Sequence, residues 1–515
     1  MLATVLVLLA CLPAAATAPA DQPDRKSPNV LFIMCDQLTA GVMSAYGGPV
    51  ATPHIDRLAR EGVRFNQAIC PTPFCSPTRA SIITGMYPHA HGIVVNCRQG
   101  PLTPGNPGIT TKDVTTEKLL HDSGYTTHHY GKWHLFGQRL PYYPDMYNVD
   151  EEYLEEMKDI FAKVRELSRS EWMEWYVWAL PVAVAPPIRQ AQEAVGQAWK
   201  DKRFADFILK MGRLKLPLEQ VFDVRVAQLT ADRIRALAGQ GKPFMITCSF
   251  NGPHDPNVVS SPYYEEFDPD KIRLPDNVSA TEKRFEKDWS RQIVIGLKEP
   301  GLREFLRIYY GTIRMLDDQV GRILAALDAA GTTDDTIIVF TADHGDMAGG
   351  HGMVWKSTSA FYDEIARVPL IIRYPRKLKP QASDLTTDLT DLMPTLLDLL
   401  GRPIPAQAQG LSLVPFLTGQ RDPSQGRRYA FSERVIASQK GTRQLGKGTT
   451  GSFMIRGQGW KYIRYGQGPG QQFLYHLTED PGETRNLADD PAYATKVKEL
   501  AAELDAWLQR TVWPR

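Results

Sequence analysis

The sequence is poor in cysteine, with only six among 515 residues. Their irregular spacing fits neither a zinc-binding motif nor the dense disulfide framework of a small secreted domain. Cys70 and Cys97 flank a polar motif around Cys75 and are candidates for a disulfide with each other. Cys35 and Cys248 lie in apolar, strand-like runs, so we expect buried thiols there.

The sequence also lacks a net charge: 59 Lys and Arg against 58 Asp and Glu give +1 at pH 7. Binding to nucleic acid or to an anionic membrane by counterion release needs a basic surface, so the composition argues against both partners. Any attraction for an anionic substrate must therefore be local to a pocket.

No segment beyond residue 20 is long and apolar enough to be a transmembrane helix. Residues 1–20 are apolar and end in small residues before the first charge, which predicts a signal peptide and export to the periplasm or the medium. Because a basic start is missing, a buried N-terminal helix is the alternative. Residues 8–11 also resemble a bacterial lipoprotein box, in which Cys11 would carry a lipid anchor.

What the sequence does have is a series of buried-strand patterns separated by helical patterns. The strand patterns are short, apolar and rich in β-branched residues, at 29–35, 243–250 and 336–341. Helical periodicity intervenes at 55–60, 228–238 and 319–330. This alternation predicts an α/β fold with a mostly parallel central sheet flanked by helices.

The pattern changes after about residue 420 to short strands separated by turn residues, followed by an amphipathic helix at 494–512. We therefore expect a catalytic domain over 28–420 and a smaller C-terminal antiparallel sheet-plus-helix subdomain over 421–515. Residues 151–218 stand apart as a helical insertion, where Trp172, Trp175 and Trp178 recur at helical spacing. That stripe is either a packed surface or a cleft wall on which a sugar or aryl ring stacks.

Each predicted strand is followed by polar side chains. Asp36 and Gln37 follow the first strand, His254 the second, and Asp343 and His344 the third. Ligands in open α/β sheets bind beyond the carboxyl ends of the strands, so we expect these groups to converge. Carboxylate and amide oxygens suit Ca²⁺ or Mg²⁺, whereas a nitrogen ligand favours Mn²⁺. Taken singly, such residues are more often helix caps or turn formers.

The stretch 75–85 places a candidate nucleophile, Cys75, beside Pro77, Thr78 and Arg79. It resembles the signature of the type I sulfatases of the alkaline phosphatase-like superfamily, Cys-x-Pro-Ser/Thr-Arg followed by a hydrophobic-Thr-Gly end. The resemblance implies that a formylglycine-generating enzyme oxidises Cys75 to formylglycine, whose hydrated aldehyde attacks the sulfur of a sulfate ester. It also implies that Arg79 steadies this hydrate. A direct thiolate nucleophile or a metal ligand is the competing interpretation of Cys75.

Residues 124–134 resemble the second sulfatase signature, with a Gly-Tyr start and a Gly-Lys-x-His end. By that match Lys132 bridges the nucleophile and the sulfate oxygens, and His134 is the base at the nucleophile's hydroxyl. His254 matches the histidine that protonates the leaving alcohol, with Asp255 as an orienting partner. Lys356 matches the lysine that clamps the sulfate.

The same resemblance implies a site for one divalent cation, Ca²⁺ before Mg²⁺ or Mn²⁺, at Asp36, Gln37, Asp343 and His344. Many relatives carry Asp where Gln37 stands and Asn where His344 stands. Gln and His occur at the matching positions of the related phosphonate monoester hydrolases.

The sequence therefore predicts an exported sulfatase that hydrolyses a sulfate ester, of a sulfated carbohydrate rather than an aryl or choline sulfate. The export signal, the long insertion and its aromatic residues favour the carbohydrate. A phosphonate monoester or phosphodiester hydrolase with the same nucleophile is the nearest alternative. A non-catalytic glycan-binding protein that retains the fold is an alternative from another class.

Overall fold

The computed structural model describes residues 27–97, 108–135, 140, 142–143, 146–147, 180–357, 360–435, 451–466 and 471–511. The expected signal peptide with Cys11 and the expected tryptophan stripe at 172–178 lie outside the described residues.

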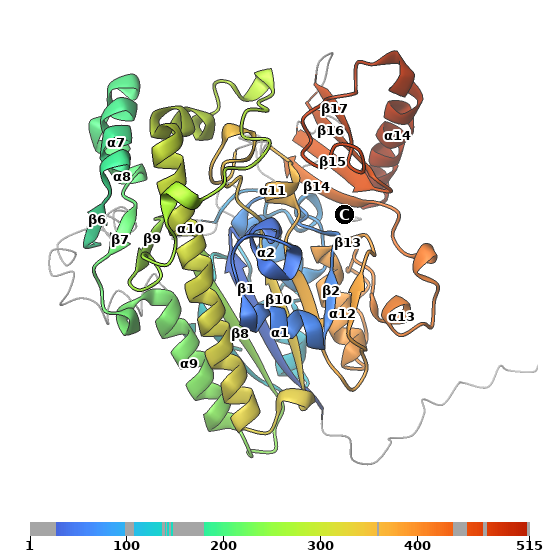
Figure 1. Cartoon of the computed structure of the whole chain (residues 1–515). Coiled ribbons are helices and arrows are strands. Elements are labelled where there is room, and N and C mark those ends of the chain that lie inside the picture. Colours follow the sequence, from blue (N-terminus) through green and yellow to red (C-terminus); the bar gives the residue numbers. More distant parts are fainter. Residues whose placement is uncertain are drawn as a thin grey trace, which may run out of the picture.

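The centre of the molecule is an eight-stranded sheet (Figure 1). Its strands are β1 (Asn29–Asp36), β2 (Val63–Phe65), β4 (Thr126–Gly131), β5 (Met146–Tyr147), β8 (Phe244–Pro253), β10 (Thr336–Ala342), β11 (Leu370–Arg373) and β12 (Gln381–Ser383). The order across the sheet is β12-β2-β11-β10-β1-β8-β4-β5. All neighbours pair in parallel except β11, which is antiparallel to both β10 and β2. The prediction of a mostly parallel sheet is confirmed.

Helices cover both faces of this sheet. The α-helices of the described chain are α1 (Pro53–Glu61), α2 (Cys75–Thr84), α3 (Pro88–His91), α4 (Thr116–Asp122), α7 (Pro186–Trp199), α8 (Lys202–Ile208), α9 (Phe222–Leu237), α10 (Trp289–Ala329), α11 (Asp363–Ala366), α12 (Leu392–Leu399), α13 (Val414–Leu417) and α14 (Ala494–Arg510), and only some of them lie on this sheet. Successive side chains of a strand point to opposite faces, and β4 shows which helices lie on each. Tyr130 accepts a hydrogen bond from Arg233 of α9, whereas His129 lines a small cavity with α2, α4 and α12. Within the described chain, no helix combines the length and apolar character that a membrane crossing needs.

The described part of the expected insertion, 180–218, contains α7 and α8 and two short strands. These strands, β6 (Val182–Val184) and β7 (Gly212–Leu214), form a three-stranded sheet with β9 (Val258–Ser260). Helix α7 begins at a proline pair, with Pro186 as its first residue. Proline is tolerated there since the first N–H groups of a helix have no intrahelical partner.

The C-terminal part is a separate antiparallel sheet with α14 packed on it, in red at the upper right of Figure 1. Its strands follow one another in order: β14 (Ala430–Val435), β15 (Gly451–Gly457), β16 (Trp460–Tyr465) and β17 (Gln472–His476). The buried residues Leu500, Leu504 and Trp507 of α14 pack in one apolar cluster with side chains of these strands. Two further short strands, β3 (Ala68–Ile69) and β13 (Thr387–Asp388), pair with each other.

The five cysteines of the described chain are free thiols, so the proposed Cys70–Cys97 disulfide is not formed. Cys70 contacts the carbonyl oxygen of Ile365 at 3.6 Å, and burial raises the pKa of its thiol. Cys35 and Cys248 are buried thiols in β1 and β8, as predicted.

A buried ion pair joins the main part of the chain to the C-terminal sheet. His89 of α3 donates from Nδ1 to Glu433 of β14 at 2.8 Å, and its backbone N–H donates to the same carboxylate. The other ring nitrogen lies 2.9 Å from the hydroxyl of Thr511, which itself donates to a backbone carbonyl. Both ring nitrogens are therefore donors, so the imidazole is cationic. Burial opposes this charge, but Glu433 raises the pKa of His89 above its usual value.

We predict that Glu433→Gln lowers the free energy of unfolding by about 1–3 kcal/mol near pH 6, because a buried cation loses its partner. Because the pKa of His89 is raised in the folded state, its ion pair contributes fully to stability below the unfolded-state pKa, about 6.5. This contribution is lost as pH rises through the folded-state pKa of His89. The wild type should therefore lose stability above pH 6.5 in urea titrations, and the variant should show a flatter profile. The pair His476–Glu479, whose carboxylate is exposed, supplies the control, Glu479→Gln. Equal pH profiles for wild type and Glu433→Gln would contradict the account.

Candidate active site

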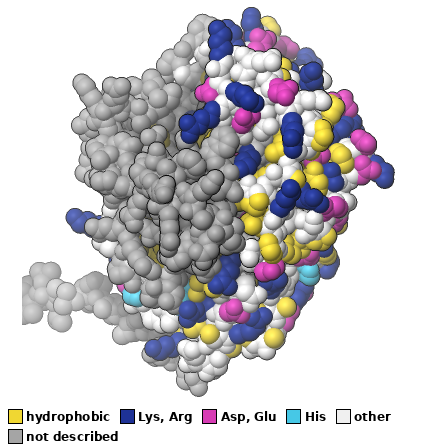
Figure 2. Space-filling view, turned by 90° about the vertical axis from the view of Figure 1, so that its left-hand side faces the viewer, with side chains coloured by type: hydrophobic (Ala, Val, Ile, Leu, Met, Phe, Trp, Pro, Cys, Tyr) yellow, Lys and Arg dark blue, Asp and Glu magenta, His cyan; other side chains and the backbone are white. Residues whose placement is uncertain are grey.

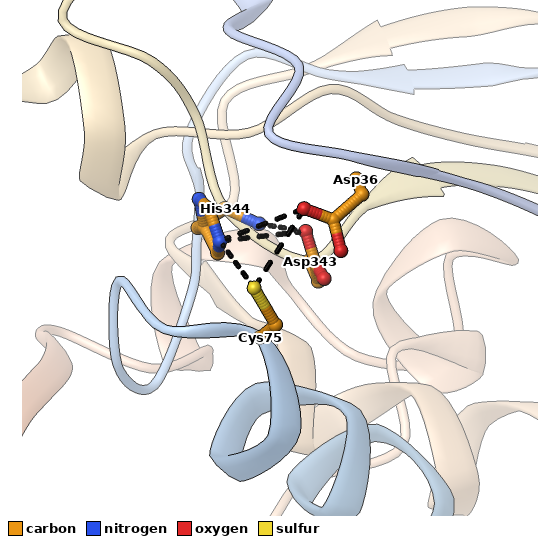
Figure 3. A group of neighbouring side chains, drawn as sticks. All are labelled: Asp36, Cys75, Asp343 and His344. Atoms are coloured by element: carbon orange, nitrogen blue, oxygen red, sulfur yellow. Dashed lines mark hydrogen bonds and ion pairs between the residues drawn. The ribbon is translucent and has the colours of Figure 1, made fainter. Parts of the chain in front are cut away.

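The carboxyl ends of four adjacent parallel strands place polar side chains at one edge of the sheet. Asp36 ends β1, and Asp343 and His344 follow β10 directly. Lys132 follows β4, and His254 follows β8. Figure 3 shows Asp36, Asp343 and His344 converging on Cys75, which begins α2. Residues from distant parts of the sequence thus meet as the topology of a parallel sheet requires.

Arg79 holds this edge together from within α2. Its side chain is 1% exposed and forms ion pairs with Asp343 at 2.8 Å and with Asp36 at 3.0 Å. The remaining guanidinium N–H groups donate to the Lys132 carbonyl at 2.8 Å and to the Ser249 hydroxyl at 2.9 Å. One buried cation therefore fixes three strand ends relative to the helix that carries Cys75.

The pKa values of the two strand-end carboxyls, Asp36 and Asp343, are shifted in opposite directions. Burial works to raise the pKa of Asp36, but Lys132, whose ammonium lies 2.8 Å away, and other nearby cations hold it well below its usual range. Burial and the charge of Asp36 raise the pKa of Asp343 to about 6. Two buried carboxyls that interact this strongly favour the binding of a cation between them.

The donor set fits a divalent cation. Ligand atoms of Asp36, Asp343 and His344 lie, together with the Cys75 sulfur, within 4.8 Å of one another. Gln37 follows Asp36 directly along the chain, and its backbone adopts φ 65°, a conformation rare outside glycine. Its N–H donates to Asp343 at 3.1 Å and its carbonyl accepts from Tyr309 at 2.8 Å. The backbone is therefore held in a strained conformation at the site.

Cys75 lies at the N-terminus of α2 inside a ring of cationic and imidazole groups. Its sulfur is 3.2 Å from Nε2 of His344 and 3.5 Å from Nζ of Lys356. Burial and Asp36 oppose ionisation of the thiol, yet Lys356, Lys132 and His344 hold the pKa of Cys75 well below its usual value. A low thiol pKa at a helix N-terminus marks a reactive position rather than a structural one.

His134 approaches Cys75 from the loop after β4. It is hydrogen-bonded to the Cys75 side chain, and burial lowers the pKa of its imidazole to about 4. A neutral imidazole at neutral pH can accept a proton, as a general base must. The loop is tied to α2 because the Ser76 hydroxyl donates to the His134 carbonyl at 2.5 Å.

Lys356 and His254 lie next to each other, with the Lys356 ammonium close to the Cys75 sulfur. Lys356 donates to Nε2 of His254 at 2.8 Å and to the amide oxygen of Gln37 at 3.1 Å. Nδ1 of His254 is 2.8 Å from the Asp255 carbonyl and 3.2 Å from its carboxylate, so Asp255 orients the ring. Burial opposes the charge on Lys356, but Cys75 and Asp36 raise its pKa.

Two contributors were not singled out from the sequence. Ser249 accepts from Arg79, and Asp346 accepts from the Gln37 amide at 2.8 Å, which turns the amide oxygen toward Lys356. Asp346 also accepts from the backbone N–H of Trp355, so it fixes the loop that carries Lys356. Asp346 could have been predicted from the Asp-His-Gly-Asp pattern that follows β10. Ser249 could not, because nothing in the sequence of a β-strand distinguishes one serine from another.

Other titratable groups of the motifs lie outside this cluster. His351 stacks on Tyr362 at a centroid separation of 3.6 Å and therefore shapes its loop. A second cluster, His54 with Asp317 and Asp318, has a structural use because Asp317 accepts from backbone N–H groups in the first turn of α1.

Comparison with known proteins matches residues 28–402 to the Sulfatase family and residues 349–510 to the C-terminal region of N-sulphoglucosamine sulphohydrolase. A delta 4,5-hexuronate-2-O-sulfatase of Bacteroides thetaiotaomicron is 29% identical over 95% of this chain and 90% of that protein. An N-acetylglucosamine-6-O-sulfatase of the same organism is 28% identical over 98% of this chain and 90% of that protein. The crystal structure of a phosphonate monoester hydrolase of Agrobacterium radiobacter superposes with a TM-score of 0.72 at 28% identity, covering 94% of this chain and 96% of that chain.

The sheet and the strand-end cluster define a hydrolase of the alkaline phosphatase-like class. The chain belongs to the sulfatase family and is a sulfuric ester hydrolase. The predictions of fold class, family and enzyme type are confirmed.

We predict that Ca²⁺ or Mn²⁺, added to chelator-treated protein, raises the melting temperature by an amount that grows with cation concentration. The reason is that a ligand at 100 times its Kd stabilises the folded state by about 2.7 kcal/mol. Asp343→Asn removes a ligand charge and should abolish most of this shift in differential scanning fluorimetry. Asp318→Asn, in the second cluster, is the control and should retain it. A full shift in Asp343→Asn would place the cation elsewhere.

Proposed function

We propose that this enzyme cleaves the sulfate ester of a sulfated carbohydrate outside the cytoplasm, with a formylglycine derived from Cys75 as nucleophile. The observation that carries the proposal is the surroundings of Cys75. Cys75 is the first residue of α2, and its sulfur lies close to Lys356 and His344. The imidazole of His134 is hydrogen-bonded to the Cys75 side chain. In this structure the cysteine sulfur stands in for the attacking oxygen. The hydrated aldehyde would supply one hydroxyl to attack sulfur and a second to expel the sulfate.

The cations and the histidines divide the remaining work. Lys132 and Lys356 bind the sulfate oxygens, and Arg79 holds the strand ends so that these charges are in place before substrate arrives. His134, neutral because its pKa is low, accepts a proton from the nucleophile's hydroxyl. His254, oriented by Asp255, donates a proton to the leaving alcohol oxygen.

We assign one divalent cation to Asp36, Gln37, Asp343 and His344, with Ca²⁺ preferred because three of the four donors are oxygens. When bound, the cation would draw charge from the sulfate oxygens and offset the two carboxylates. The nitrogen donor of His344 makes Mn²⁺ the first alternative, and Mg²⁺ the second.

A sulfated glycan is the preferred substrate class. The two relatives compared above are named for sulfated hexuronate and sulfated N-acetylglucosamine, and each aligns over nine-tenths or more of this chain. On the face seen in Figure 2 the described Lys, Arg, Asp and Glu side chains are interspersed. The net charge of only +1 supplies no broad positive field, so recognition of an anionic sugar depends on the local cations of the site.

Maturation and export complete the proposal. A formylglycine-generating enzyme would act on Cys75 within its Pro-Thr-Arg context, and residues 1–20 would direct export, with Cys11 as the lipid-anchored alternative. We assign catalysis to a domain of residues 28–420, which includes the 151–218 insertion, and a supporting role to a subdomain of residues 421–515.

A second candidate function is hydrolysis of phosphonate monoesters or phosphodiesters. Gln37 and His344 favour it, and the Agrobacterium radiobacter phosphonate monoester hydrolase shares the fold at 28% identity. Sulfate monoesters and phosphodiesters are both monoanionic with a tetrahedral centre, so the same cations and nucleophile can serve either reaction.

The test compares both ester classes on one purified, metal-loaded sample. We predict a kcat/KM for sulfated monosaccharides well above that for a phosphonate monoester or a phosphodiester. Cys75→Ala should lower it by more than about 10³-fold, since the nucleophile is lost. A phosphodiester preference would support the second function. Undiminished sulfate turnover by Cys75→Ala would overturn the assigned nucleophile.

A further inference from the structure

Arg434 carries a half-buried guanidinium next to the site and has no acidic partner among the described residues. It lies near the end of β14, paired with Ser452 of β15. Its Cζ lies 3.7 Å from the centroid of the Phe74 ring. Within the described residues it forms no ion pair and donates no hydrogen bond, so the Phe74 ring is its one partner there.

Other arginines of the same sheet are neutralised. Arg456 forms an ion pair with Asp363 at 2.7 Å, and Arg464 forms one with Asp505 at 2.8 Å. The acidic neighbour of Arg434 on its own strand, Glu433, points to the opposite face and is bound to His89. In the described part of the chain, β14 thus gives Glu433 a charged partner and gives Arg434 none.

An unpaired guanidinium in a partly dehydrated position costs stability. Arginine is rarely buried without a partner, since removing its charge from water is unfavourable. Burial lowers the pKa of Arg434 to about 10, and the charge of Cys75 only partly offsets this. The cation–π contact with Phe74 returns only about 0.5–2 kcal/mol. An anionic group of a bound ligand would give the Arg434 guanidinium a partner of opposite charge.

The position relates directly to the nucleophile. Phe74 is the N-cap residue of α2 and immediately precedes Cys75. The ammonium of Lys356, 3.5 Å from the Cys75 sulfur, lies 5.9 Å from the centroid of the same Phe74 ring. Two cations thus lie around one ring, so they are no further apart than the sum of their distances from its centroid. That span suits a single substituted sugar.

We propose that Arg434 is a specificity-determining residue that binds a second anionic group of the substrate, a carboxylate or a further sulfate, with Phe74 as the apolar wall beside it. This inference rests on the proposed function, because it places the scissile sulfate at Cys75 and Lys356. A guanidinium offers two parallel N–H donors that match either a carboxylate or a sulfate, which a lysine cannot reproduce.

The experiment measures binding in the Cys75→Ala background, where turnover is removed. Isothermal titration calorimetry compares two ligand pairs, each a sugar with one sulfate and its counterpart with a second anion. The first pair is N-acetylglucosamine 6-sulfate and glucosamine 2-N,6-O-disulfate, and the second is a hexose 2-sulfate and a hexuronate 2-sulfate. We expect at least one doubly anionic ligand to bind more tightly, and Arg434→Gln to reduce that preference by about 10- to 100-fold.

Two further variants keep the outcome interpretable. Arg464→Gln removes an arginine from the same sheet and should retain the preference, and Arg434→Lys should restore part of it. Loss of preference in the first pair alone identifies a sulfate, and loss in the second alone a carboxylate. The inference is overturned if neither pair shows a preference, if Arg434→Gln retains it, or if that variant weakens all four ligands equally.

Turnover of the same sugars by the Cys75 protein separates this inference from the proposed function. If no sulfate is released while the Arg434-dependent preference persists, the proposed reaction is wrong and the binding role stands. If sulfate is released and the preference is independent of Arg434, only the role of Arg434 is wrong.

Discussion

The structure depends on the buried ion network in which Arg79 joins Asp36 and Asp343. These groups lie on a helix and at the ends of two strands, and all three side chains are inaccessible to solvent. Removing one partner from such a network typically costs about 3–5 kcal/mol, because it leaves an uncompensated buried charge. The same arginine binds the Lys132 carbonyl and the Ser249 hydroxyl, so four sheet strands and the nucleophile helix share one anchor. The network therefore fixes the helix that begins with Cys75 relative to the strand ends.

Charge balance then explains what the site can bind. Asp36 and Asp343 are bound to Arg79, while Lys356 lies 3.5 Å from the Cys75 sulfur and donates to His254. An anion that approaches Cys75 therefore meets cations, although the chain as a whole has a net charge of only +1. This is electrostatic preorganisation of the kind that usually contributes most to such reactions. In the proposal above, Arg434 adds a further cation, which binds a second anionic group of the substrate away from the sulfate that reacts.

Much of this arrangement could be predicted from the sequence. The strands β1, β8 and β10 are short, apolar, β-branched runs, and the polar residues after them converge because parallel strands end at one edge. The roles of Ser249 and Asp346 were not readable, since each depends on a partner far away in sequence. Proximity also misled us: Cys70 and Cys97 flank the motif, yet Cys70 contacts Ile365 and remains a thiol. Arg434 resembles any strand arginine until the tertiary structure shows which of its neighbours are already paired.

The central claim is that Cys75 is converted into the nucleophile, and mass spectrometry of the natively expressed protein tests it most directly. Trypsin releases the peptide 65–79, which contains Cys75 and also Cys70 as an internal control. We predict loss of sulfur and gain of oxygen at Cys75 alone. Ordinary thiol oxidation adds oxygen and retains sulfur, so damage cannot imitate this product. An unmodified thiol at Cys75 in a fully active sample would contradict the account.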